Sequence, residues 1–172
     1  MSEELLQTAI DLFNQGNIDG AIEHLESKLS DNPDSAQVHH MYAEFANMKN
    51  SEAQEDVIPG RKIMMMYKKA MELDEENMEY IADFAAFALE CRRIPVAIKE
   101  FQRYARRLEL EDIPVDEILF TASRNIVDAI EVMDPSKKNP MVQPWLQQAL
   151  IWAVGGLGYS KDEAVEMINR EM

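Results

Sequence analysis

Cysteine is almost absent from this sequence, and glycine and proline are scarce. The single cysteine, Cys91, cannot form a disulfide within the chain, so the fold cannot depend on disulfide bonds. The 172 residues include six glycines and seven prolines, too few for the many tight turns of an all-β protein. Alanine, leucine, glutamate, methionine and glutamine are frequent, and these residues favour helices. We therefore expect an all-α fold.

Long apolar runs are also lacking. The most apolar stretch, residues 145–157, contains two glutamines and is shorter than the roughly 20 residues that a transmembrane helix needs. The chain begins without the basic start and apolar run of a secretory signal, and its lone cysteine suits a reducing compartment. These features lead us to expect a cytoplasmic protein with no membrane insertion.

Motifs for catalysis and metal binding are missing as well. The histidines are His24, His39 and His40, and the adjacent pair points about 100° apart on a helix, which makes it a poor metal site. We expect surface or groove histidines. The sequence has no glycine-rich phosphate loop and no Gly-x-Ser-x-Gly motif, and its acidic clusters lack the pattern of a calcium loop. We therefore expect no catalytic residue, metal or cofactor, and an enzyme or metalloprotein is the least favoured alternative.

Basic residues are few, which bears on the partners of the protein. The 17 lysines and arginines face 32 acidic residues, for a net charge of −15. Nucleic-acid binding depends on neutralising phosphates with cations, so we expect no nucleic-acid partner. Residues 1–60 carry 12 acids and two lysines, whereas residues 61–112 carry 11 acids and 10 bases. The acidic first part favours an apolar or basic partner.

Two segments of the chain match each other at a distance of 76 residues. Residues 15–25 and 91–101 each contain a turn and then an Ala-Ile pair, with a large apolar residue, Leu25 or Phe101, four positions after the alanine. Both resemble the tetratricopeptide repeat, a helix-turn-helix unit of 34 residues. Since 76 residues are two such periods plus eight, the match predicts a middle repeat that carries an insertion.

The resemblance implies about three degenerate repeats over residues 1–112, arranged as antiparallel helical hairpins in a short right-handed α-solenoid. Small residues are expected where paired helices approach closely, namely at Ala9, Ala21, Ala85 and Ala97. Tyr104 departs from the pattern, because a small residue is usual there. In the middle repeat, we expect a helix at residues 36–49 and extra residues at 50–61, which form either an ordered lid or a loose loop.

Residues 113–172 predict further helices after the repeats. Apolar residues recur at helical spacing up to Met133, and a last helix is expected from Ser160, whose Ser-Lys-Asp-Glu start is a capping box. Between them we expect a helix at residues 144–154 that is broken by Gly155-Gly156. Because a repeat array exposes apolar surface at its final helix, we expect these helices to pack on the array as a cap within a single structural domain.

An alternative concerns the end of the chain. Residues 157–164 resemble the turn and last helix of ubiquitin-associated three-helix domains. This short match leaves open that residues 144–172 are a separate binding module instead of a cap.

The resemblance to the tetratricopeptide family also implies a function and a binding surface. Family members are protein-protein interaction scaffolds or chaperone-like adaptors, in which the first helix of each repeat lines a concave groove. The corresponding residues here are Leu6, Ile10, Phe13, His40, Met41, Glu44, Asn47, Met48, Asp83 and Ala86. This groove would be apolar at one end and acidic at the other, so it would bind a partner segment that is apolar or basic.

A cluster of basic residues suggests a second possibility. It consists of Arg92, Arg93, Lys99, Arg103, Arg106 and Arg107. The cluster could bind an acidic partner, or the acidic residues 1–60 of another copy, which would make the protein a self-assembling homo-oligomer. The other interpretation is a solvated helix face on which these cations form ion pairs with Glu100, Glu109 and Glu111.

Overall fold

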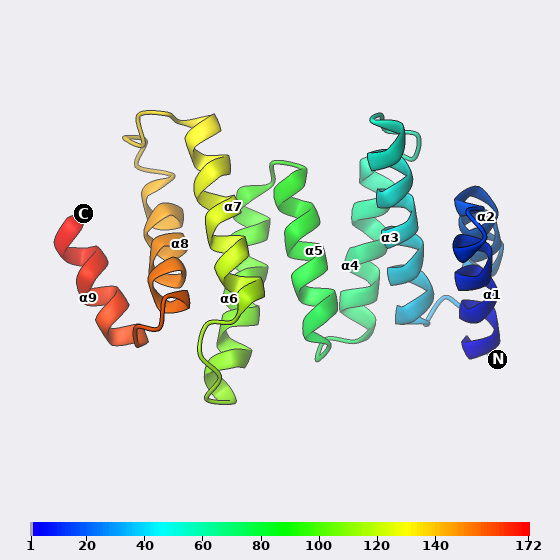
Figure 1. The fold of residues 1–172 in the computed structure, drawn as a ribbon, viewed down its shortest axis with the longest axis horizontal. Coiled ribbons are helices and arrows are strands. Elements are labelled where there is room, and N and C mark those ends of the chain that lie inside the picture. The colour runs from blue at the N-terminus through cyan, green and yellow to red at the C-terminus, as the bar shows by residue number, and fades with distance from the viewer. Residues whose placement is uncertain (1) are drawn as a thin grey trace. The chain divides into compact units, whose positions relative to one another are not determined.

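The computed structural model describes residues 2–172, and every regular element in this range is an α-helix (Figure 1). The helices are, in chain order, α1 (Ser2–Asn14), α2 (Ile18–Leu29), α3 (Ala36–Ala53), α4 (Gly60–Leu73), α5 (Met78–Glu90), α6 (Ile94–Leu110), α7 (Glu117–Met133), α8 (Gln143–Gly156) and α9 (Lys161–Glu171). The all-α expectation is confirmed. Across the described residues, we find no helix with both the length and the apolar character that a membrane span requires.

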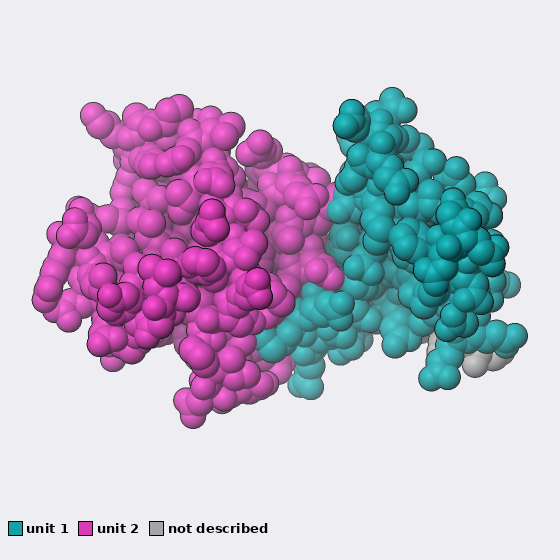
Figure 2. All heavy atoms as spheres, in the orientation of Figure 1, with its two compact units in different colours: residues 1–80 teal, residues 81–172 magenta. Residues whose placement is uncertain are grey.

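The chain divides into two compact units, and the boundary falls inside α5 (Figure 2). Unit 1 consists of residues 1–80 and unit 2 of residues 81–172. The expected arrangement, in which residues 1–112 form one array and residues 113–172 pack on it within a single domain, stays a prediction.

Unit 1 is built from helices that pack in sequence order, with α1 on α2, α2 on α3 and α3 on α4. Ala9 and Ala21 have no exposed surface, in agreement with the small residues expected where the helices of the first hairpin approach each other. Leu25 is also completely buried, and Val38 and Tyr42 of α3 continue the core.

The insertion in the middle repeat is partly helix and partly loop. The helix expected at residues 36–49 begins at Ala36 but continues to Ala53, so that α3 absorbs part of the extra sequence. The rest is an ordered loop, because the Asn50 side chain makes two hydrogen bonds to the backbone of Ile58. Its amide nitrogen donates to the Ile58 carbonyl at 2.7 Å, and its oxygen accepts from the Ile58 N–H at 2.9 Å.

Unit 2 contains most of α5, all of α6 and the helices that follow the repeats. There α6 packs on α7, α7 on α8 and α8 on α9. The helix expected to continue up to Met133 is α7, whose N-cap Asp116 accepts a hydrogen bond from the Leu119 N–H. The capping box of α9 is present, because the Ser160 hydroxyl accepts from the Glu163 N–H while the Glu163 carboxylate accepts from the Ser160 N–H.

The helix expected at residues 144–154 extends two residues further, because α8 ends at Gly156 and not before Gly155. The helix runs through both glycines, and they allow α8 to lie close to residues before and within α7. A Cβ on Gly155 would lie 2.8 Å from Val115 Cγ2, and one on Gly156 would lie 2.4 Å from Phe120 Cδ2. The glycines are therefore the last two residues of the helix and are also packing residues. Both tryptophans of the chain, Trp145 and Trp152, also belong to α8.

Candidate functional site

A hollow of about 550 Å³ opens in unit 2. It is lined by α6, by the segment before α7, by α7 and α8, and by the start of α9, which follow one another in Figure 1. The lining is mostly apolar and includes Ala105, Leu108, Ile113, Pro114, Val115, Leu119, Ile151, Trp152 and Tyr159. Its size lies within the range of protein pockets that bind ligands or side chains of a partner.

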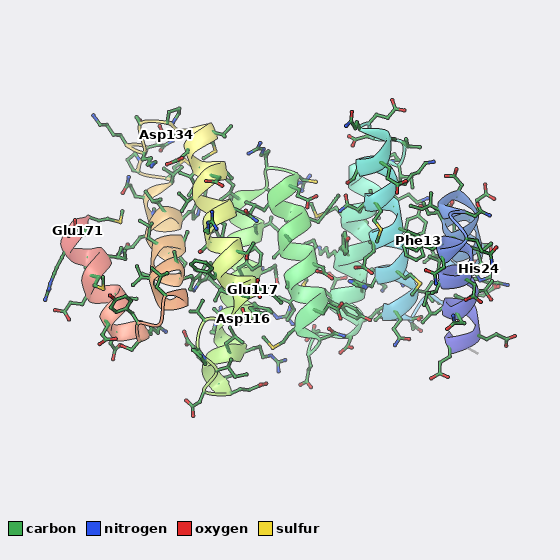
Figure 3. The ribbon with its side chains drawn as sticks, viewed as in Figure 1. Phe13, His24, Asp116, Glu117, Asp134 and Glu171 are labelled. Atoms are coloured by element: carbon green, nitrogen blue, oxygen red, sulfur yellow. The ribbon has the colours of Figure 1, made fainter. Side chains whose placement is uncertain are left out.

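The wall between α6 and α7 is held by Tyr104 and Asp116. The Tyr104 hydroxyl donates a hydrogen bond of 2.5 Å to Asp116 Oδ2, while Asp116 Oδ1 accepts from the Leu119 N–H at 2.9 Å. One carboxylate thus caps α7 and fixes it to α6 (Figure 3). Burial, together with this hydrogen bond, raises the pKa of Tyr104 above its ordinary value of 10.0. The tyrosine is therefore a neutral donor at physiological pH.

Polar side chains gather at the edge of the hollow. Lys161, at the start of α9, forms an ion pair with Glu109 of α6 at 2.8 Å. The other polar lining residues include Gln102 and Arg106 from α6 and Gln148 from α8. The hollow therefore combines apolar walls with hydrogen-bond donors and acceptors at its edge, which is typical of sites that bind a side chain and orient the segment bearing it.

Helix α6 also carries a second, basic cleft of about 360 Å³. Its lining consists of Lys99, Glu100, Arg103, Arg106, Arg107 and Leu110. Four of the six bases that form the expected basic cluster thus meet in one cleft. Arg92 and Arg93 are exposed, precede α6 and do not line it.

Of the acidic partners expected for the basic cluster, Glu100 pairs as expected and Glu109 pairs elsewhere. Arg103 does pair with Glu100, with 3.7 Å between Nη1 and Oε2. Glu109, however, pairs with Lys161 of α9. Glu100 exposes 7% of its surface, and its Oε2 accepts no hydrogen bond from the described residues. The cleft therefore holds one buried carboxylate among four cations.

The groove residues expected from the first helix of each repeat lie on α1, α3 and α5. In unit 1, apolar side chains at these positions are half-buried, among them Leu6, Ile10, Phe13 and Met41, and Met48 is 38% exposed. Phe13 of α1 stacks on Phe45 of α3 with 4.7 Å between ring centroids, so the apolar stripe of α1 meets α3 (Figure 3).

The polar residues expected in the groove of unit 1 differ in burial: His40 is buried, whereas Glu44 and Asn47 are half-buried. His40 is 7% exposed and lies against the rings of Tyr67 and Tyr80, at centroid distances of 5.8 and 4.5 Å. Its Nδ1 lies 3.7 Å from Glu44 Oε2. Asn47 is half-buried in unit 1.

The other histidines are also accounted for by local contacts. His39 is 7% exposed and bonds through Nδ1 to the Ser35 carbonyl of its own helix, at 2.7 Å. His24 bonds through Nε2 to the Leu5 carbonyl at 3.2 Å. His39 and His40 are both buried, so neither is a surface histidine. The position of His40 in a groove stays a prediction.

In unit 2, Asp83 is half-buried and Ala86 is exposed, both on α5. The groove as one surface stays a prediction.

The hollow in unit 2 was missed by reasoning from sequence. One signal for it was present: Tyr104 stands where the repeat pattern has a small residue, and this departure supplies the hydroxyl that fixes α7 to α6. The other signal was Gly155-Gly156. In the sequence this pair indicates a helix end, and in the structure it allows close packing against Val115 and Phe120. The walls themselves join residues about 50 positions apart, which no local pattern predicts.

Comparisons with known proteins show similarity of fold. No protein-family model matches the chain, and no curated protein matches its sequence. Two crystal structures of MamA are similar, one at 18% identity and a TM-score of 0.55 over 94% of this chain and 91% of that chain, the other at 16% identity and 0.57 over 98% and 86%. A tetratricopeptide repeat protein from Parabacteroides merdae is similar at 12% identity and a TM-score of 0.56, over 98% of this chain and 64% of that chain.

The helix order, the matching hairpins and these structural neighbours agree. The chain has a tetratricopeptide-repeat-like fold of helical hairpins, followed by additional C-terminal helices.

Proposed function

We propose that this protein is a protein-protein interaction scaffold, or a chaperone-like adaptor, that binds a segment of a partner protein along unit 1. The observation that carries the proposal is the apolar stripe of α1. Leu6, Ile10 and Phe13 follow one another at spacings of four and three and are only half-buried. A stripe of this kind in a helix that already packs on α2 and α3 offers apolar surface to a partner.

The chemistry of the partner follows from the charges around this stripe. Glu3, Glu4 and Asp11 of α1 are exposed, and Glu44 of α3 is half-buried. A basic or neutral amphipathic segment would place its apolar face on the stripe and its cations near these carboxylates. In this proposal the protein acts in the cytoplasm, needs no cofactor and is not an enzyme.

The test is affinity capture on a triple variant. Leu6→Glu, Ile10→Glu and Met41→Glu together place three carboxylates on the proposed groove. A partner that is bound by the natural protein should be lost, because burying these charges is unfavourable. The retained proteins would be identified by mass spectrometry, and circular dichroism would check that the variant remains helical.

A matched variant separates the groove from a general charge effect. Asn14→Glu, Gln37→Glu and Ser51→Glu add the same three charges at exposed positions of α1 and α3. The partner should stay bound to this control. Loss from both variants, or from neither, would contradict a groove on α1 and α3.

A second candidate function is self-assembly, favoured by the basic cleft of unit 2. The cleft presents Lys99, Arg103, Arg106 and Arg107, whereas residues 1–60 carry 12 acids against two lysines. In this alternative, the acidic part of one copy binds the cleft of another. Sedimentation at rising protein concentration tests it, and the mass should rise with concentration and fall with added salt.

A further inference from the structure

We infer that the hollow and the basic cleft of unit 2 form a second docking surface, which binds an acidic segment of another protein through one large apolar side chain. This surface lies on different helices from the groove proposed on α1 and α3, and it selects the opposite charge. The inference therefore stands or falls independently of that groove.

Arg106 joins the two halves of the surface. It lines both the hollow and the basic cleft. On α6, Gln102, Ala105 and Glu109 line the hollow, while Lys99, Arg103, Arg107 and Leu110 line the cleft. A segment lying across α6 would thus meet an apolar hollow on one side and cations on the other.

The hollow can accept a large side chain. Its lining includes Ile113, which is 41% exposed, and Tyr159, which is 47% exposed, so the hollow offers accessible apolar surface to a partner. A volume of about 550 Å³ is larger than any single side chain, so the hollow has room for an aromatic or long aliphatic residue. Apolar pockets that take one such side chain commonly supply much of the binding energy of an interface.

The charges beside the hollow select the flanking residues of the segment. The cleft holds four cations and one carboxylate, Glu100. The Glu109 carboxylate at the hollow pairs with Lys161. Arg106 is exposed, and the described residues provide it with no ion-pair partner, so its guanidinium can bind a carboxylate of a partner in bidentate geometry.

The negative charge of the whole chain does not cancel this preference. Charges separated by more than about 8 Å are largely screened at physiological salt, so an acidic segment on α6 interacts mainly with the cleft. The net charge of −15 on the whole chain instead slows the approach of an acidic partner at low salt.

The experiment is a selection of 12-residue peptides from a random phage-displayed library on the immobilised full chain. We expect the enriched peptides to share a large apolar residue flanked by Asp or Glu. Synthetic copies would then be labelled with fluorescein and titrated by anisotropy. Replacing Glu by Gln in such a peptide should weaken binding about tenfold.

Two kinds of variant locate the bound peptide. Gln102→Trp, and separately Gln148→Trp, would fill the hollow from α6 or from α8, and each should weaken binding at least tenfold. Arg106→Glu should weaken it about tenfold by charge repulsion. Arg124→Glu makes the same charge change on an exposed residue of α7 that lines neither site, and Asn125→Trp adds the same bulk there. Both controls should bind normally.

The outcomes that overturn the inference are distinct from those that overturn the proposed scaffold. Enriched peptides that are basic, peptides that ignore the α6 variants, or no enrichment would each contradict a docking surface on unit 2. Loss of the acidic peptides in the Leu6, Ile10 and Met41 triple variant would place them on unit 1. A concentration-dependent mass that Arg106→Glu abolishes would identify a second copy as the occupant.

Discussion

Gly16 and Arg92 lie 76 residues apart and hold the same position in the turn of a helical hairpin. Both have left-handed backbone conformations, with φ of 77° and 60°. In each turn the backbone N–H of the next residue donates to a carbonyl five residues earlier, at 2.9 Å after Gly16 and 2.8 Å after Arg92. This is the Schellman motif, in which glycine is the favoured residue at the left-handed position. The arginine therefore occupies a conformation that costs about 1 kcal/mol.

The first prediction concerns this turn. Arg92→Gly should be more stable than Arg92→Ala by about 1 kcal/mol, because both variants remove the side chain but only glycine relieves the left-handed strain. Urea unfolding measures the difference. Gly16→Ala should lose a similar amount, since open space surrounds the added Cβ and only the backbone conformation opposes it. Equal stability of the two Arg92 variants would show that the turn relaxes without strain.

The second prediction concerns the bond between Tyr104 and Asp116. Tyr104→Phe should destabilise the protein by about 1.5 kcal/mol at pH 7, because a hydrogen bond to a carboxylate is lost. Burial raises the pKa of Tyr104 on folding, so its contribution is complete below the unfolded pKa of 10.0 and is lost as pH rises through the folded value. The difference in free energy of unfolding between the natural protein and Tyr104→Phe should therefore stay constant from pH 7 to 9 and shrink above pH 10.

Urea unfolding at each pH provides this measurement, and Tyr159→Phe, at an exposed tyrosine, is the control. If the natural protein exceeds Tyr104→Phe in free energy of unfolding by the same amount at pH 11 as at pH 7, the proposed linkage is ruled out.

The third prediction concerns the close approach of α8 to the residues before and within α7. Gly156→Ala should destabilise the protein by about 2 kcal/mol, because the new Cβ would lie 2.4 Å from the ring of Phe120. This outweighs the gain of about 1 kcal/mol that alanine normally brings inside a helix. Thermal unfolding would measure the effect, and Phe120→Leu in the same chain should recover part of it.

Gly60→Ala is the matched control, because nothing lies within 4 Å of its added Cβ. It should leave stability unchanged or raise it slightly. A stable Gly156→Ala variant would show that α8 and α7 can move apart.

The fourth prediction concerns the start of α9. The backbone N–H of Ser160, and then its hydroxyl, lower the pKa of Glu163 below 4.5. Ser160→Ala removes only the hydroxyl, so the pKa of Glu163 should rise but remain below its ordinary value. Because a lowered pKa stabilises the cap only above the unfolded pKa, α9 should fray as pH falls through the folded value. Carboxyl-carbon NMR titration measures the pKa, and amide hydrogen exchange in α9 measures the fraying. An unchanged pKa in Ser160→Ala would show that the hydroxyl does not interact with the Glu163 carboxylate.

Much of the fold could be predicted from the sequence because its signals are local. The matching segments around Ala21 and Ala97 predicted two hairpins, and the Ser160 start predicted α9, since turn conformation and capping depend on neighbouring residues. The position of the insertion in the sequence was predicted, but its structure was not. Its extra turn of α3 and the loop held by Asn50 depend on a side-chain contact eight residues away.

The candidate site in unit 2 could not be predicted in the same way. Its walls bring α6 together with α8 and α9, and the ion pair of Glu109 with Lys161 spans 52 positions. The glycines of α8 were expected to follow the helix end because glycine usually weakens helices, whereas here they form its last two residues and pack against Val115 and Phe120. The basic cluster was predicted by helical spacing, but the hollow beside it was not.

Because both tryptophans lie on α8, tryptophan fluorescence reports on unit 2 alone. Trp152 is buried and Trp145 half-buried, so unfolding of unit 2 changes the fluorescence of both, whereas unit 1 contains no tryptophan. Far-ultraviolet circular dichroism follows the helices of both units. Coincident denaturation curves from the two signals would show that the units unfold as one cooperative domain, and separate midpoints would show that each melts independently.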